Sequence, residues 1–152
     1  MERLEGNATT DFGAPGVVPE MDRLPVSVDR LAELIGLLQA SWRTFEKVAG
    51  AVRGEELGPA GPRGGGRTLD GIRSHLLEAQ SAYLSAVGGR AKAGMSWKVL
   101  ETDFLAALRA RARGELADVG PRGGKRWPVP YAIRRSAWHA LDHAWEIENR
   151  SA

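Results

Sequence analysis

Cysteine is absent from this chain of 152 residues, and histidine occurs only three times. Without cysteine the protein has no disulfide bonds, no thiolate metal ligands and no cysteine nucleophile. No run of apolar residues approaches the roughly 18 that a membrane-spanning helix requires. The first residues, M-E-R-L-E-G-N-A-T-T-D, are acidic and polar, unlike a secretory signal. These absences favour a cytoplasmic protein that does not enter the membrane.

Charge is nearly balanced overall, with a net charge of +2, but it is unevenly distributed along the chain. Residues 1–60 carry ten acidic and six basic side chains, whereas residues 61–152 carry nine acidic and fifteen basic ones. Arginine dominates among the bases, and its planar guanidinium binds carboxylates and phosphates. An anionic substrate is one interpretation of this basic half. The other is that the arginines are solvated surface residues.

No alternating pattern predicts β-strands, whereas apolar residues recur at three- and four-residue steps in four segments. These segments predict helices over residues 27–53, 68–87, 97–114 and 130–149. Ser27 and Ser96 are suited to cap helices, and Pro130 is suited to a first helical turn. The chain length fits one domain. We therefore expect an all-α four-helix bundle over residues 27–150, preceded by an irregular N-terminal arm over residues 1–26.

The last predicted helix is apolar around much of its circumference, which is typical of a central, buried helix. Trp138 and Trp145 lie together on one of its apolar stripes. We expect both indole rings to be buried, with each burial stabilising the bundle by about 2 to 3 kcal/mol.

The three histidines are the candidate functional residues. His139 and His143 stand four residues apart in W-H-A-L-D-H-A-W, so they share one face of the last predicted helix. His75 lies among apolar residues of the second predicted helix. Three imidazoles from two facing helices predict a divalent-metal site with an open coordination position, as in catalytic metal sites. The alternative is that these histidines serve packing or surface chemistry.

One acidic residue lies close to the histidine pair. The motif H-A-L-D-H differs from the zinc-protease motif H-E-x-x-H because Ala140 replaces the glutamate that acts there as the base. Glu146 lies one turn beyond His143 on the same stripe, where it is placed to orient an imidazole or to act on bound water. Its other predicted role is an ion pair with Arg150, four residues further on.

Two glycine–arginine segments are nearly identical and each precedes a histidine-bearing helix. They are G-P-R-G-G-G-R, with Arg63 and Arg67, and G-P-R-G-G-K-R, with Arg122 and Arg126. Glycine-rich backbone and helix N-termini both favour bound anions. These four arginines are therefore candidate anion- or substrate-binding residues beside the metal. The alternative is two flexible turns of similar composition.

The histidine-bearing segments resemble the DinB/YfiT-like superfamily of metal-dependent four-helix bundles. The residues that carry the resemblance are R-S-H-L-L-E-A-Q-S-A-Y and Y-A-I-R-R-S-A-W-H-A-L-D-H-A-W-E-I-E-N-R, and it extends over residues 24–150. It implies metal ligation by His75, His139 and His143 in an up-down-down-up bundle that is often a homodimer. Relatives include S-transferases that use bacillithiol or mycothiol and a mycothiol-dependent maleylpyruvate isomerase.

Several functions follow from these patterns. The first is a metal-dependent enzyme, in which zinc or nickel activates water or a low-molecular-weight thiol towards a small-molecule substrate. Its reaction would be that of a thiol-dependent S-transferase or a hydrolase. The alternative is a non-catalytic metal-binding stress-response module. Nucleic-acid binding is disfavoured because the arginines are scattered and no recognition motif is present. No catalytic residue apart from the metal ligands is identified by these patterns.

Overall fold

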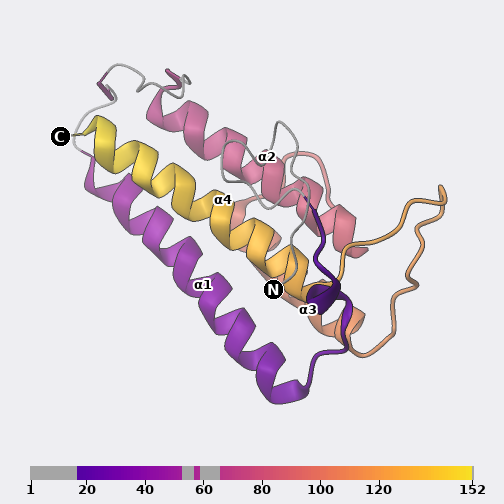
Figure 1. The fold of residues 1–152 in the computed structure, drawn as a ribbon. Helices are drawn as coiled ribbons and strands as arrows, with labels where there is room; N and C mark the ends of the chain where they lie inside the picture. Colours follow the sequence, from indigo (N-terminus) through magenta and orange to yellow (C-terminus); the bar gives the residue numbers. More distant parts are fainter. Residues whose placement is uncertain (1–16, 53–56, 59–65, 152) are drawn as a thin grey trace.

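The structure is a computed structural model that describes residues 17–52, 57–58 and 66–151. Four α-helices make up most of this part of the chain (Figure 1). They are α1 (Val28–Ala51), α2 (Leu69–Val87), α3 (Trp97–Ala112) and α4 (Val129–Arg150). A short 3₁₀ helix, η2 (Glu20–Arg23), precedes them. The described residues contain no β-strand, only an isolated bridge between Val119 and Lys125. The expected all-α bundle of four helices is confirmed for these residues.

Side-chain caps define three of the helix starts, where backbone N–H groups have no partner within the helix. The Ser27 hydroxyl accepts a hydrogen bond from the Arg30 N–H. Thr68 caps α2 and Ser96 caps α3 in the same way. In α4 the first turn instead contains Pro130, whose missing N–H removes one of the unpaired donors. Local sequence thus accounts for where all four helices begin.

Contacts between the helices establish an up-down-down-up order of directions. α1 and α4 run in the same direction (Figure 1). Consistent with this, Val52 and Ser151 at their C-terminal ends line the same cavity of about 360 Å³. α2 runs antiparallel to α4, since Gln80 contacts Ser136 whereas the Ala86 carbonyl accepts from the N–H of Trp127. The order of directions is the one that the resemblance implies.

α3 is also antiparallel to α1, because Phe45 and Trp42 of α1 meet Trp97, while Gln39 reaches Glu101. Consecutive helices α2 and α3 therefore run in the same direction. Residues 88–96 connect them and can span about 30 Å when extended, more than the roughly 24 Å length of α3. The connection is therefore long enough to return along the bundle.

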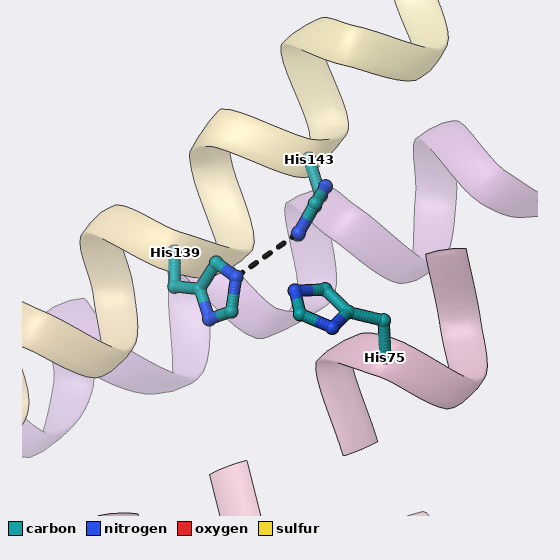
Figure 2. Close-up of side chains that lie close together, drawn as sticks. All are labelled: His75, His139 and His143. Carbon is teal, nitrogen blue, oxygen red and sulfur yellow. Dashed lines mark hydrogen bonds between the residues drawn. The ribbon is translucent and has the colours of Figure 1, made fainter. Parts of the chain in front are cut away.

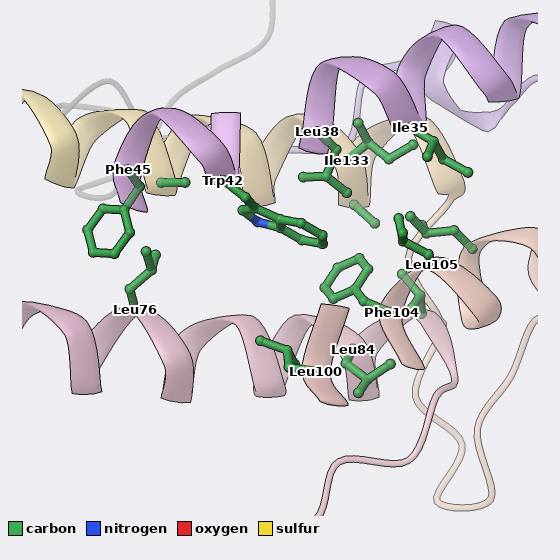
Figure 3. Packing of buried hydrophobic residues seen from close by; sticks show 14 of the residues in the cluster. Ile35, Leu38, Trp42, Phe45, Leu76, Leu84, Leu100, Phe104, Leu105 and Ile133 are labelled. Atoms are coloured by element: carbon green, nitrogen blue, oxygen red, sulfur yellow. The ribbon is translucent and has the colours of Figure 1, made fainter. Parts of the chain in front are cut away.

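Aromatic and aliphatic side chains fill the space between the helices (Figure 3). Trp42 of α1 packs edge-on against Trp97 and Phe104 of α3, with ring centroids 5.8 and 5.7 Å away.

The expected burial of both outer tryptophans of α4 is wrong. Trp145 is 55% exposed, and Trp138 is only partly buried. The interior of the bundle lies on the other faces of α4, against α1 and α2. Every described helix is too short or too polar to span a lipid bilayer.

Part of the expected N-terminal arm is described. Within residues 17–26, η2 contributes Asp22, which is buried and forms an ion pair with Arg134 of α4. Only η2 is helical within this part, and residues 17–19 and 24–26 have no regular secondary structure. The ion pair of Asp22 joins η2 to the bundle and gives the buried carboxylate a charged partner. The rest of the expected arm, residues 1–16, lies outside the described residues.

We expect the bundle to be largely formed without metal, because burial of apolar residues from all four helices supplies the main stabilisation. Metal would then add only a binding term set by its affinity. Circular dichroism of the chelated protein should retain the helical signal of the untreated protein. A random-coil spectrum after chelation, as for small zinc domains, would contradict this prediction.

Candidate metal centre

Three imidazoles meet between α2 and α4 (Figure 2). His75 comes from α2, and His139 and His143 come from successive turns of α4. Each offers a nitrogen to one common space, and these three atoms lie within 4.8 Å of one another. His139 and His143 are buried, whereas His75 is partly accessible. The helical spacing of the pair and the antiparallel packing of α2 thus bring all three candidate ligands together.

Hydrogen bonds hold both rings of the α4 pair by their Nδ1 atoms. Tyr83 Oη lies 3.2 Å from Nδ1 of His139. Glu146 Oε2 lies 2.8 Å from Nδ1 of His143, and its other oxygen accepts from Arg150. The two Nε2 atoms face each other at 3.0 Å. Glu146 therefore makes both contacts for which it was a candidate, to an imidazole and to Arg150.

This donor set fits a divalent cation. Tetrahedral zinc with bonds of about 2.05 Å needs ligand nitrogens about 3.3 Å apart, and right-angled coordination needs about 2.9 Å. The observed Nε2–Nε2 separation of 3.0 Å is within a few tenths of an ångström of both values. A metal-bound Nε2 requires the proton on Nδ1, where Tyr83 and Glu146 are placed to accept it. For the α4 pair the fit therefore includes the ring orientation as well as the ligand type.

Burial and nearby charges favour the neutral form of His139 and of His75, which is the form that ligates metal. Burial, together with the neighbouring histidines and the guanidinium groups of Arg135 and Arg67, lowers the pKa of His139 from 6.5 to about 3. Burial also lowers the pKa of His75, again with a contribution from Arg67. At neutral pH no proton competes with a metal for His139.

The depressed pKa predicts how the metal-free protein responds to acid. Between about pH 6.5 and about pH 3 the unfolded chain protonates His139 and the folded protein does not. The contribution of His139 to the free energy of unfolding is therefore fully present above about pH 6.5 and is lost as the pH falls towards 3. Urea unfolding of chelated protein at pH 7 and pH 4.5 should show a smaller loss of stability in His139→Leu than in the wild type. Equal losses would contradict the prediction.

Two residues near the candidate metal ligands were not singled out as site residues by sequence patterns. The Trp138 ring stacks on His139 at an interplanar angle of 18°. The Arg135 guanidinium lies over both Trp138 and Tyr83, 5.2 and 5.7 Å from the ring centroids. Arg135 precedes His139 by one helical turn, and that spacing is the only signal in the sequence that could have placed it here.

The described candidate arginines, Arg67, Arg122 and Arg126, do not form one group. Arg67 immediately precedes the Thr68 cap of α2 and lies close enough to lower the pKa of His75 and His139. Arg126 instead packs against Gly88, just beyond the other end of α2, and donates to the Ala117 carbonyl. Arg67 leads into α2 and Arg126 leads into α4, and because these helices are antiparallel the two arginines lie at opposite ends of the bundle.

The expected ring of arginines around the metal site is therefore not formed by Arg67 and Arg126 together. Arg126 instead holds the connection between α3 and α4 by its hydrogen bond to the Ala117 carbonyl. Arg111 contributes to the same connection by its ion pair with Asp118. Arg122 is exposed in the same connection. Arg63 lies outside the described residues. Anion binding by Arg67 remains a prediction.

A search with protein-family models, curated proteins and solved structures finds no match to this chain. The chemistry of the histidine site is therefore the basis on which a function can be proposed.

Proposed function

We propose that this protein binds one divalent metal ion through His75, His139 and His143 and uses it as a metal-dependent enzyme of the thiol-dependent S-transferase or hydrolase type. The observation that carries the proposal is the convergence of three imidazole nitrogens within 4.8 Å. Membership of the DinB/YfiT-like superfamily, which the histidine pattern resembles, is part of the proposal.

The chemistry of the donors narrows the choice of ion. Three neutral imidazoles and no carboxylate among the ligands suit zinc or nickel better than magnesium or calcium, which prefer oxygen. With three protein ligands, a cation held here would keep a position for a water or thiol and lower its pKa. Tyr83 and Glu146 serve this chemistry by holding the two α4 imidazoles in the ligating tautomer.

Arg67 is the residue placed to bind an anionic substrate or thiol beside the histidines. It is exposed, lies close to His75 and His139, and forms no ion pair with another residue of the described chain. We expect Arg67→Ala to weaken binding of a small anion, such as malonate, to metal-loaded protein without changing metal content. Arg126→Ala is the matched control, because it removes the same residue of the parallel motif at the far end of α2. Equal anion affinity in the wild type and Arg67→Ala, measured calorimetrically, would show that Arg67 is only a solvated surface residue.

The catalytic proposal is tested by comparing metal-loaded and chelated protein in two assays. One measures transfer of small thiols to 1-chloro-2,4-dinitrobenzene, and the other measures hydrolysis of p-nitrophenyl acetate. We expect turnover that depends on the metal and disappears in His139→Ala. Absence of metal-dependent turnover with every thiol and with the ester would leave the non-catalytic alternative.

The non-catalytic alternative, a metal-binding stress-response module, is favoured by one contact. Arg150, which binds Glu146, also donates to the carbonyl oxygen of Gly58 at 3.0 Å. The histidine site is thus linked to the connection between α1 and α2, so metal would also stabilise that junction. A large rise in melting temperature on metal binding, without turnover, is the result that this alternative predicts.

A further inference from the structure

Gln80 of α2 and Ser136 of α4 form a polar pair inside the apolar interface between these helices. Both side chains have no exposed surface. The Ser136 hydroxyl donates to Gln80 Oε1. Gln80 Nε2 donates in turn to the backbone carbonyl of Ser136 at 3.1 Å. The pair therefore joins the two helices that carry the metal ligands.

Stability alone does not explain this pair. Burying an amide and a hydroxyl costs free energy that their mutual hydrogen bonds only approximately recover, so two apolar side chains of similar shape would serve as well. A buried polar pair differs from an apolar contact because it is satisfied in one alignment only. Any displacement leaves buried donors and acceptors without partners. Buried polar residues are known to specify the register of packed helices in this way.

The position of the pair relates it to the histidines. Ser136 precedes His139 by three residues, and Gln80 precedes Tyr83 by three. Because α2 and α4 are antiparallel, Tyr83 and His139 lie about one turn to either side of the pair, and their side chains meet at 3.2 Å. His75 lies five residues before Gln80 on α2. A slip of one helical turn, about 5.4 Å, would move His75 away from the α4 histidines and break the polar pair.

We propose that Gln80 and Ser136 are positioning residues that set the axial alignment of α2 against α4 and so bring His75 to the α4 histidines. The inference rests on the proposed metal site, but its structural part, the alignment, is separately measurable. Neither residue is proposed to touch the metal or a substrate.

The decisive variant is Gln80→Leu/Ser136→Ala, which replaces the pair by apolar side chains without leaving an unpaired group. We expect it to unfold at a urea midpoint equal to or above that of the wild type. Its zinc affinity should be about tenfold weaker or more, in the range found when groups that orient metal ligands are removed. The absorption spectrum of its cobalt-loaded form should also change. Ser41→Ala is the matched control, because Ser41 is also buried, at 5% exposure, but its hydroxyl donates to the carbonyl oxygen of Leu38 in its own helix.

A second measurement tests the alignment without metal. Since the chain has no cysteine, Ala82→Cys and Trp145→Cys place single spin labels on exposed positions of α2 and α4. In the Gln80→Leu/Ser136→Ala background the distribution of label distances should broaden or shift, whereas Ser41→Ala should leave it unchanged. Unchanged label distances would overturn the inference whether or not zinc binds. Unchanged zinc affinity beside a shifted distribution would overturn its claim on the metal site. Failure of the wild type to bind zinc would overturn that claim together with the proposed function. The label distances would then test only the role of the pair in helix alignment.

Discussion

His143→Ala is expected to lose stoichiometric metal and to bind zinc more than about 100-fold more weakly than the wild type. That loss exceeds the 10- to 100-fold effects typical of groups that only orient the ligands. His143 contributes a nitrogen 3.0 Å from that of His139, and its ring is fixed by Glu146. Removing it leaves two ligands on different helices. Elemental analysis and competition with a chelator measure the effect.

A graded variant separates ligation from a general disturbance of the site. Tyr83→Phe keeps all three imidazoles and removes only the hydroxyl at Nδ1 of His139. Its zinc affinity should lie between that of the wild type and that of His143→Ala. Full metal content in a variant with all three histidines replaced by alanine would contradict the assigned ligands.

Trp42→Ala is expected to destabilise the bundle by about 3 to 5 kcal/mol, a large part of the 5 to 15 kcal/mol typical of a domain. The Trp42 side chain is 2% exposed and contacts the rings of Trp97 and Phe104. Its removal would leave a cavity between α1 and α3. Urea unfolding of chelated protein measures the loss without a contribution from metal.

Trp145→Ala is the matched control for the packing prediction. The same residue type is removed, but Trp145 is 55% exposed on α4. We expect a change within about 0.5 kcal/mol, as for ordinary surface substitutions. Equal losses in the two variants would mean that the bundle does not pack in the way described.

Local patterns predicted the helices and their starts because caps and apolar stripes act within one segment. Ser27 and Ser96 occupy the expected cap positions, and Pro130 lies in the first turn of α4. The histidine cluster was also predictable in outline, because the four-residue step between His139 and His143 defines a shared face whatever the neighbours are. Only the packing of α2 against α4 was needed to add His75.

Features that depend on helix direction could not be read from the sequence. Arg67 and Arg126 occupy matching places in two similar segments, but antiparallel packing sends them to opposite ends of α2. Trp145 lies on a helix with several apolar stripes, and the stripes that face α1 and α2 are decided by packing. The partnership of Gln80 with Ser136 likewise depends on an alignment that no local pattern encodes.

The most direct test of the account is X-ray absorption spectroscopy of the protein loaded with one equivalent of zinc. We expect three imidazole nitrogens at about 2.0 to 2.1 Å, with the remaining coordination supplied by a light-atom ligand such as water. In His143→Ala the imidazole scattering should fall or the metal should be absent. A spectrum with one imidazole or none, or with only oxygen ligands, would contradict the claim that His75, His139 and His143 form a single metal site.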